Sequence, residues 1–410
     1  MSPKKILPLL PLLPLLLAPT LQAQEKSLHL AVGDPARKDK EAQVVLDGIT
    51  DTRTGEVIAP AELPKRLAGV RLLLVGESHT DMDYHRCELR VVQELVRAGR
   101  PVLLGLEMYP YTEQRFLDDW VDGKLTEEAF LHGSRWYENW GYNWLYYREI
   151  FLFAREHKLR IFAVNAPRDV VTAVRKKGFK NLTPEEAAHI PADIDTSSPD
   201  HRTLFKSFFE SGGDSLHSSM TDAQVDSMIA AQSTWDATMA FNAIKALKEH
   251  AKPETGPDTV MVVLVGSGHV VYGLGIQRQA ARHFEGRIAT VVPVNVRDEE
   301  GHDVKTVQAS YADFVWGLPA QADPIYPSLG LSSNPVEGEK ALKVIFVSEK
   351  TPAEKAGVQV GDVIVFLDGT PVPDKETLNR LVAAKRWGDE AVLAVKRGSE
   401  TKEIHIALRR

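Results

Sequence analysis

Two copies of the pattern Gly-x-x-His follow apolar runs in this sequence. The first copy contributes Glu77 and His79, and the second copy ends at His269. Glu107 follows a third apolar run. Because polar residues just beyond the carboxyl ends of parallel strands share one edge of a sheet, we expect these four side chains to lie close together.

Such a group of side chains supports two kinds of hydrolytic chemistry. In a metal site, the neutral imidazoles of His79 and His269 with Glu77 or Glu107 would hold zinc, manganese or cobalt and leave a position for water. Without a metal, His79 would act as a general base oriented by Glu107, because an imidazole near its ordinary pKa of ~6.5 exchanges protons at neutral pH. The residue types leave both alternatives open.

A third chemistry, haem binding, requires an axial tyrosine, histidine or methionine in an apolar slot. Residues 136–153 hold nine aromatic side chains in 18 positions, which offers such a slot. The alternative is that half of this set lies on one helical face and only forms core. Arg168 follows a strand and either binds a propionate or caps its helix. The candidate iron ligands and ring contacts are Tyr84, His85, Tyr142, Tyr146 and Tyr147.

The elements that must position these residues alternate between strand and helix patterns. Apolar runs predict strands at residues 71–75, 101–106, 159–164, 259–265 and, as the last one, 288–294. Helical spacing predicts helices at residues 83–98, 111–121, 168–177 and 222–250, and a long aromatic helix ending at residue 157. Strands that are buried on both faces and separated by helices indicate an α/β domain with a mostly parallel sheet and flanking helices.

Two further features of the sequence bear on this arrangement. Gln232 and Asp236 lie four residues apart on the helix at 222–250, so they share a face and predict a polar network directed at the site. Residues 181–219 are rich in Asp, Ser, Pro and Gly and predict an irregular loop with one short helix near residues 205–209. The remaining histidines, His201 among them, share no spacing and are expected at the surface.

Composition excludes several classes of protein. The chain has 410 residues, of which 43% are hydrophobic and 26% charged, values typical of globular proteins. Its formal net charge of −7 and its lack of a basic cluster argue against a nucleic-acid partner. The single cysteine, Cys87, allows no internal disulfide and no thiolate metal cage.

Residues 1–23 have the pattern of an export signal. Lys4 and Lys5 precede an almost wholly Leu, Pro and Ala run, and Ala23 offers a cleavage site. The apolar run is shorter than the ~20 residues of a spanning helix, and an uncleaved anchor is the alternative. No cysteine follows the run, so no lipobox is expected. The segment predicts a location in the periplasm or cell envelope.

Three prolines within residues 317–327 predict a linker, which we place at residues 317–325. The segments Thr351–Val358, Val360–Ile364 and Leu367–Gly369 after it resemble a PDZ domain of the bacterial periplasmic type, spanning residues 326–410. The resemblance implies a groove that binds a peptide or protein C-terminus, and the alternative is a small β-domain that only stiffens the protein. The expected peptide-binding residues are Leu329, Gly330, Leu331 and Leu378.

Motifs in the first domain form an ordered set along the chain. They are Gly76-Glu77-Ser78-His79, His85, Gly105-Leu106-Glu107-Met108, Asn165-Ala166-Pro167-Arg168-Asp169, Gln232, Trp235-Asp236, Met239-Ala240 and Gly266-Ser267-Gly268-His269. This set resembles the ChaN family of the haem-binding-uptake and TIKI superfamily over residues 44–316. The resemblance implies an α/β domain that binds haem in iron acquisition, often as a homodimer with haem between subunits. Relatives in the superfamily are metal-dependent proteases or esterases that use the same motifs.

The sequence therefore predicts an exported haem-binding protein of the ChaN type with a peptide-binding PDZ module. The first alternative is a metal-dependent hydrolase or peptidase that uses Glu77, His79, Glu107 and His269 and recruits substrate through the PDZ domain. The second alternative is a non-catalytic envelope adaptor. Whether the protein turns over a substrate is left open by the sequence.

Overall fold

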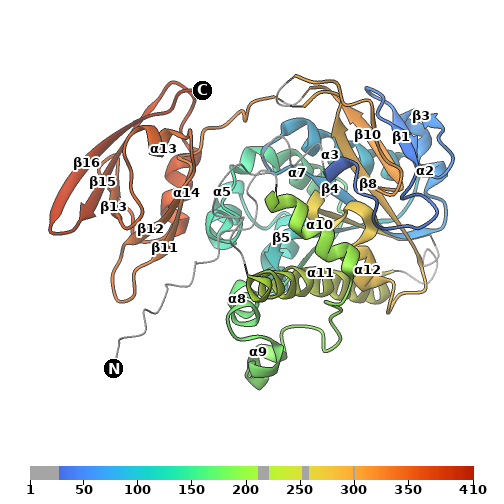
Figure 1. Cartoon of the computed structure of the whole chain (residues 1–410), viewed down its shortest axis with the longest axis horizontal. Helices are drawn as coiled ribbons and strands as arrows, with labels where there is room; N and C mark the ends of the chain where they lie inside the picture. The colour runs from blue at the N-terminus through green and yellow to red at the C-terminus, as the bar shows by residue number, and fades with distance from the viewer. Residues whose placement is uncertain (1–26, 211–220, 252–257, 299–300, 321) are drawn as a thin grey trace. The chain divides into compact units, whose positions relative to one another are not determined.

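The computed structural model describes residues 27–210, 221–251, 258–298, 301–320 and 322–410. The expected export signal at residues 1–23 lies outside the described residues. Two compact units make up the described chain, with the boundary between Ile325 and Tyr326 (Figure 1). Within the described ranges, no helix has both the length and the apolar content that a bilayer span requires.

An eight-stranded sheet forms the centre of the first unit among its described residues. Six neighbouring strands are parallel, and β2 and β3 continue the sheet in antiparallel pairing. The α/β class with a mostly parallel sheet is confirmed. The strands in spatial order are β3 (Val57–Ile58), β2 (Ile49–Asp51), β10 (Phe314–Leu318), β8 (Arg287–Asn295), β4 (Val70–Glu77), β7 (Val260–Gly266), β5 (Val102–Pro110) and β6 (Ile161–Asn165).

The central strands are long apolar runs because helices cover both faces of the sheet. All seven residues of β7 are buried. The expectation that residues 288–294 form the last strand of this domain was wrong, because β10 adds a further parallel strand beside β8. Two short strands, β1 (Glu41–Gln43) and β9 (Thr306–Gln308), pair separately.

The longest helix of the described chain, α11, lies along one face of the sheet, with α8 and α12 beside it (Figure 1). Its Met239 and Ala243 join a buried cluster with Leu72 of β4 and Val263 of β7. The helices of this unit are α2 (Leu63–Arg66), α3 (Met82–Arg97), α4 (Gln114–Val121), α5 (Glu127–Gly133), α6 (Trp136–Asn139), α7 (Arg148–Glu156), α8 (Arg168–Lys177), α9 (Pro184–Ala187), α10 (Pro199–Glu210), α11 (Asp222–His250) and α12 (Ile276–Ala280).

The aromatic segment is not the single long helix that its spacing predicted. It consists of α6, a 3-10 turn at Trp144–Tyr146 and α7. Gly141 has φ +88°, a left-handed conformation that interrupts helical geometry. The segment at 181–219 also differs from the expected loop, since α9 and α10 lie in it, and residues 211–219 are outside the described part.

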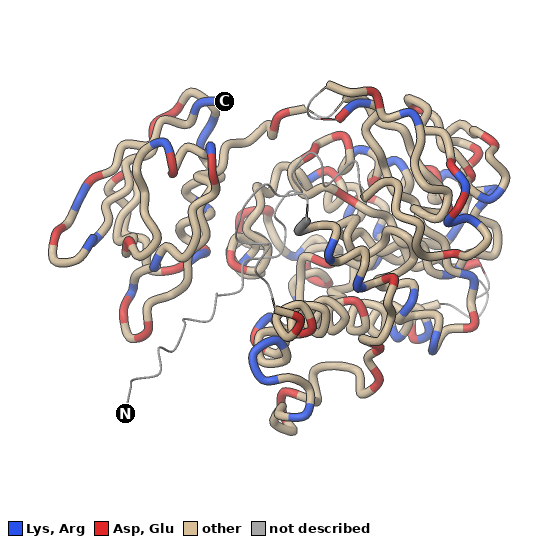
Figure 2. The backbone as a smooth tube through the Cα atoms, in the orientation of Figure 1, with Lys and Arg blue, Asp and Glu red and all other residues tan. Residues whose placement is uncertain are grey.

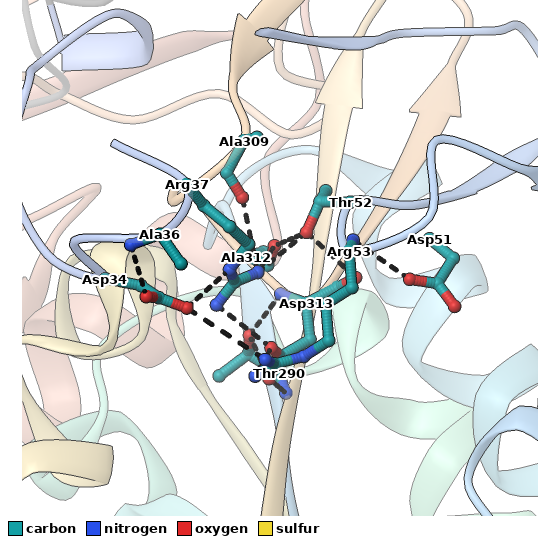
Figure 3. A network of polar contacts seen from close by, with 10 residues as sticks. All are labelled: Asp34, Ala36, Arg37, Asp51, Thr52, Arg53, Thr290, Ala309, Ala312 and Asp313. Carbon is teal, nitrogen blue, oxygen red and sulfur yellow. Dashed lines mark hydrogen bonds and ion pairs between the residues drawn. The ribbon is translucent and has the colours of Figure 1, made fainter. Parts of the chain in front are cut away.

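Arg37 joins the start of the described chain to the sheet (Figure 3). Its guanidinium lies 2.8 Å from Asp34 and 3.2 Å from Asp313, and it donates hydrogen bonds to Thr52 Oγ1 and to the carbonyl of Ala312. Asp313 in turn accepts from the backbone N–H of residue 290 in β8. This buried network fixes residues 34–37 against the strands β8 and β10.

The second unit is a small antiparallel sheet with two helices. Apolar side chains on one face of its strands, among them Leu342, Ile364 and Leu393, form its core. Its elements are β11 (Leu331–Pro335), β12 (Leu342–Val347), α13 (Pro352–Lys355), β13 (Val363–Leu367), β14 (Thr370–Pro371), α14 (Lys375–Ala383), β15 (Glu390–Arg397) and β16 (Glu400–Ala407). Basic and acidic positions are interspersed along the backbone of both units (Figure 2).

Candidate functional site

Strand order brings the expected site residues together. β7 lies between β4 and β5, so the turn after β7 is flanked by the ends of both neighbours. Glu77 ends β4, Glu107 belongs to β5, and His269 closes the 3-10 turn η5 (Ser267–His269) after β7. With His79, these residues form what we call the strand-end cluster, and all four side chains are buried.

On the Glu77 side, the strand-end cluster continues into an alternating series of carboxylates and imidazoles. His79 Nδ1 lies 2.6 Å from Glu77 Oε1, and His85 Nε2 lies 3.3 Å from Glu77 Oε2. His85 Nδ1 then contacts Glu88 Oε2 at 3.0 Å. The carboxylate that orients His79 is therefore Glu77, whereas the sequence-based hydrolase mechanism gave that role to Glu107.

The other half of the cluster centres on His269. Its Nδ1 lies 2.6 Å from Asp236 Oδ1 and 2.9 Å from Gln232 Nε2, so the expected polar network on α11 reaches the site. Its Nε2 lies 3.3 Å from Glu107 Oε1, and the other oxygen of Glu107 accepts a hydrogen bond from the backbone N–H of residue 266. Each ring nitrogen of His269 therefore contacts a carboxylate, Nδ1 that of Asp236 and Nε2 that of Glu107.

These contacts set the protonation of the cluster. Burial alone would lower the pKa of His269, but the charges and hydrogen bonds of Glu107 and Asp236 raise it to about 10. Burial likewise opposes protonation of His79, whose pKa is nevertheless raised by Glu77 and Glu107. Burial raises the pKa of Glu88 to about 7, against the opposing effect of His85. His269 is therefore a cation at neutral pH.

His79 offers the cluster's open coordination position. Its Nε2 is buried and has no hydrogen-bond partner among the described residues. Gly266 lies against the ring, because a Cβ at this position would be 3.1 Å from His79 Cε1 and 3.6 Å from Glu107 Oε2. Donor atoms of Glu77, His79 and Glu107 lie within 4.8 Å of one another, so this N/O set fits a divalent metal. His269 is not part of that set.

The candidate haem ligands separate into buried and accessible residues. Tyr84, Tyr146 and Tyr147 are buried, and Tyr147 donates to both carboxylate oxygens of Glu77. His85 is buried behind Glu77. Tyr142 is half-buried, with its ring centroid 4.9 Å from that of His79.

Trp140 and Arg168 complete this side of the site. The Trp140 ring centroid lies 4.8 Å from that of His79 and 5.4 Å from that of Tyr142. Arg168 is exposed and donates to the backbone carbonyl of Asn139. The aromatic segment is thus mostly core, and the partly exposed rings that lie beside His79 are those of Trp140 and Tyr142.

Sequence reasoning missed two site residues. Glu88 is completely buried, and its signal was the spacing of three residues from His85 on one helix. His201, expected at the surface, is buried on α10 with its Nε2 3.9 Å from Asp236 Oδ2. No spacing along the chain connects His201 to Asp236, because only the packing of α10 on α11 brings them together.

In the second unit, the expected peptide-binding residues differ in accessibility. Leu329 and Leu378 are buried in the core, whereas Leu331 is half-buried at the start of β11. Gly330 has φ +78°, and a Cβ there would lie 2.2 Å from Thr351 Cβ. The turn between Leu329 and Leu331 therefore requires glycine.

The family model described as haem-binding uptake, Tiki superfamily, ChaN matches residues 63–279, more than half of the chain. The chain belongs to the ChaN family. The strand-end cluster of this ChaN domain lies within the matched range. The model of the PDZ domain matches residues 327–408, so the second unit is a PDZ domain.

Among solved structures, the ChaN domain is similar to ChaN of Campylobacter jejuni, described as binding heme cofacially. The two share 18% identity over 65% of this chain and 95% of that chain, with a TM-score of 0.48.

Curated relatives match the PDZ domain. A probable periplasmic serine endoprotease, DegP-like, of Rhizobium meliloti is 38% identical over 84 residues, 20% of this chain. A probable CtpA-like serine protease of Staphylococcus haemolyticus is 35% identical over 80 residues, 19% of this chain. The match spans 16% of the length of each of these two relatives.

Proposed function

We propose that the ChaN domain binds haem beside the strand-end cluster, with Tyr142 as iron ligand and Arg168 near a propionate. The observation that carries this proposal is the position of Tyr142, which is half-buried against the ring of His79 and close enough to Arg168 for that charge to act on its phenol. Of the four candidate tyrosines, the other three are buried. The description of the family supports haem as the ligand.

Tyrosine ligation has a defined proton requirement. Burial and the carboxylates Glu77 and Glu107 raise the pKa of Tyr142, against the opposing charge of Arg168, so the free phenol is protonated at neutral pH. Bound haem would supply a ferric iron, for which a tyrosinate is a hard anionic donor. Because the phenol must lose its proton to ligate, we expect affinity for hemin to rise with pH.

Titration of the full chain with hemin tests this proposal by the absorption spectrum. We expect saturable binding near stoichiometric ratio, and Tyr142→Phe should change the spectrum of the complex and weaken binding. Tyr146→Phe is the matched control, because this buried tyrosine is close in sequence and should leave the spectrum unchanged. Absence of saturable binding, or an unaltered spectrum in Tyr142→Phe, would exclude this mode. Light scattering with and without hemin measures whether two copies share the ligand.

For the PDZ domain, we propose binding of a polypeptide C-terminus in the space between β11 and α14. β11 ends the strand order of its sheet, so one of its edges faces no other described strand. An extended peptide can pair with such an edge.

We also propose a location outside the cytoplasm, which the DegP-like relatives, named periplasmic, support. The family's description as a haem-binding uptake protein supports a role in haem or iron acquisition. Detection of the protein in the periplasmic fraction, with a cytoplasmic marker as control, tests the location.

A second candidate for the strand-end cluster is a divalent metal site for hydrolysis. The buried, unpartnered Nε2 of His79 favours it, with Glu107 in the same group of donor atoms, whereas Glu77 contacts Nδ1 and would orient the ring. A metal held there would supply Lewis-acid chemistry, while His269, with both ring nitrogens engaged, would act as a fixed cation. Calorimetric titration with zinc and manganese tests the candidate. We expect His79→Gln to lose binding, whereas His302→Gln, at an exposed histidine, should retain it.

A further inference from the structure

Residues 175–188, from the last turn of α8 to the residue after α9, form what we call the α8–α9 projection. α9 lies beyond α8 and α11, away from the sheet (Figure 1). Neither α9 nor the 3-10 turn η4 (Phe179–Asn181) contains a buried residue. Gly178 ends α8 with φ +73°, and a Cβ there would meet no described atom within 4 Å. Packing in the core therefore does not determine which side chains this projection exposes.

Basic residues gather where α8 ends (Figure 2). The last turn of α8 contains Arg175, Lys176 and Lys177, and Lys180 follows in η4. Cations in a last helical turn complement the helix dipole, but Lys180 lies beyond that turn. The dipole of α8 alone therefore does not account for the basic character of the projection.

The acidic residues of the projection leave two of these cations unpaired. Glu186 lies 2.6 Å from Lys177, which ties α9 to α8, and Glu185 is exposed on α9. Lys176 and Lys180 are exposed, and neither forms an ion pair with another described residue. Because the whole chain has a net charge of −7, the projection is a local excess of positive charge on a negative protein.

Apolar side chains lie among these lysines. Phe179 is 37% exposed. Leu182 is half-buried in the connection to α9, and Ala187 and Ala188 are exposed at its end. One exposed phenylalanine is ordinary on a protein surface. A phenylalanine beside unpaired lysines on a segment outside the core, however, is the combination that binds the interface of an anionic membrane.

We propose that the α8–α9 projection docks the ChaN domain on an anionic phospholipid membrane, with Phe179 among the headgroups and Lys176 and Lys180 at the phosphates. Size favours a membrane over a protein partner. A stable protein interface buries ~800 Å² on each side, which is more than a 3-10 turn and a four-residue helix offer. This contact is independent of the ligand that the strand-end cluster binds.

Sedimentation of the full chain with sucrose-loaded vesicles tests the proposal. We expect binding to vesicles of phosphatidylglycerol and phosphatidylcholine in equal amounts, and a loss of this binding as salt is added. Vesicles of phosphatidylcholine alone should leave the protein in solution.

Two variants remove the charges and the ring in turn. Lys176→Gln combined with Lys180→Gln should weaken binding to the anionic vesicles about twentyfold. Phe179→Ser should weaken it about fivefold, because the ring loses its contact with the headgroup region. All three side chains are exposed, so the melting temperature of each variant should match that of the natural chain.

The PDZ domain supplies matched controls. Lys343→Gln combined with Lys396→Gln changes the net charge by the same amount at two exposed lysines. Phe366→Ser removes an exposed phenylalanine. Both control variants should bind the anionic vesicles as the natural chain does.

A fluorescent label shows whether the projection itself enters the membrane. Asn181→Cys, at an exposed position of η4, accepts a nitrobenzoxadiazole label, whereas the buried Cys87 does not react. We expect the fluorescence of this label to increase and shift to shorter wavelength when anionic vesicles are added. The same label on Glu403→Cys, at an exposed position of the PDZ domain, should not respond.

Three results would overturn the proposal. The first is absence of binding to anionic vesicles, or equal binding to both kinds of vesicle, which points to the apolar run in residues 1–23. The second is binding that survives both variants of the projection, or a label at position 181 that stays in water. The third is a dimer, found by light scattering without lipid, that the double lysine variant dissociates, because the projection would then be an interface between copies.

Discussion

Tyr147 donates its phenolic hydrogen bond to Glu77, with distances of 3.1 and 3.2 Å to the two carboxylate oxygens. The tyrosine is completely buried and belongs to the aromatic cluster that includes Trp136, whose ring centroid lies 5.3 Å away. The aromatic segment therefore has a structural role at the site in addition to any contact with a ligand, because it fixes the carboxylate that orients His79.

We expect Tyr147→Phe to destabilise the protein, because a buried carboxylate loses a donor without gaining a water. The free energy of unfolding should fall by about 1–3 kcal/mol, measured by urea denaturation. The ring packing is kept in this variant, so the loss reports the hydroxyl alone. A variant as stable as the natural chain would show that Glu77 is satisfied without Tyr147.

His269 should give the protein a characteristic pH dependence. Its pKa of about 10 lies above the ordinary value near 6.5 that holds in the unfolded chain. The stabilisation by protonated His269 is therefore fully present below pH 6.5 and is lost as the pH rises toward 10. We expect the ring resonances of His269, followed by NMR in metal-free protein, to titrate above pH 8.

Glu107→Gln provides the internal test of that assignment. Removing one of the two carboxylates that raise the pKa of His269 should move its titration to lower pH. Glu403→Gln, at an exposed carboxylate in the PDZ domain, should leave it unchanged. A His269 titration below pH 6.5 in the natural chain would contradict the predicted electrostatics.

Arg37→Met should remove the link between the first described residues and the sheet. Asp313 would keep Arg53 but lose its buried partner, and two backbone carbonyls would lose a donor. We expect a loss of about 3 kcal/mol in the free energy of unfolding. Arg297→Met, which breaks an exposed pair with Asp303, should cost less than about 1 kcal/mol. Equal losses in the two variants would show that the buried network is not stabilising.

Gly330→Ala should destabilise the PDZ domain for two reasons. The residue has φ +78°, and the new Cβ would collide with Thr351. We expect a loss of about 2 kcal/mol or more, measured by calorimetry of the full chain. Gly338→Ala is the control, since Gly338 has φ +76° but a Cβ there would meet no described atom within 4 Å, and it should lose about 1 kcal/mol. Similar losses would show that the contact with Thr351 relaxes freely.

Much of the fold could be predicted because its central strands are buried on both faces. Such strands are continuous apolar runs, so β7 and the polar residues at its end are visible in sequence. β10 was missed, since its last two residues, Gly317 and Leu318, were assigned to the linker predicted at residues 317–325, whereas both are buried in the strand. The aromatic segment was misread because apolar spacing resembles a helix, whereas a left-handed Gly141 divides it.

The residues of the candidate site were likewise only partly predictable from the sequence. Glu77 and Glu107 were identifiable because strand ends meet at one edge of a sheet. The sequence did not show which histidine each carboxylate contacts. That pairing depends on the directions of the side chains beyond the ends of the strands. His201 and Asp236 meet only through helix packing, and helix packing leaves no fixed spacing in the sequence.

The first described residues of the chain make hydrogen bonds with segments that are synthesised much later. Tyr272, three residues after His269, donates to the backbone carbonyl of Ser27 across 245 positions, and Arg37 reaches the carbonyl of Ala312 across 275. In a chain that emerges in order from the ribosome or a membrane pore, residues 27–37 cannot make these contacts until almost the whole ChaN domain has followed. Such long-range closure slows folding and prolongs exposure of apolar strands. We therefore expect the ChaN domain to complete its fold only after most of its residues have been synthesised, and chaperones to act on the chain before that point.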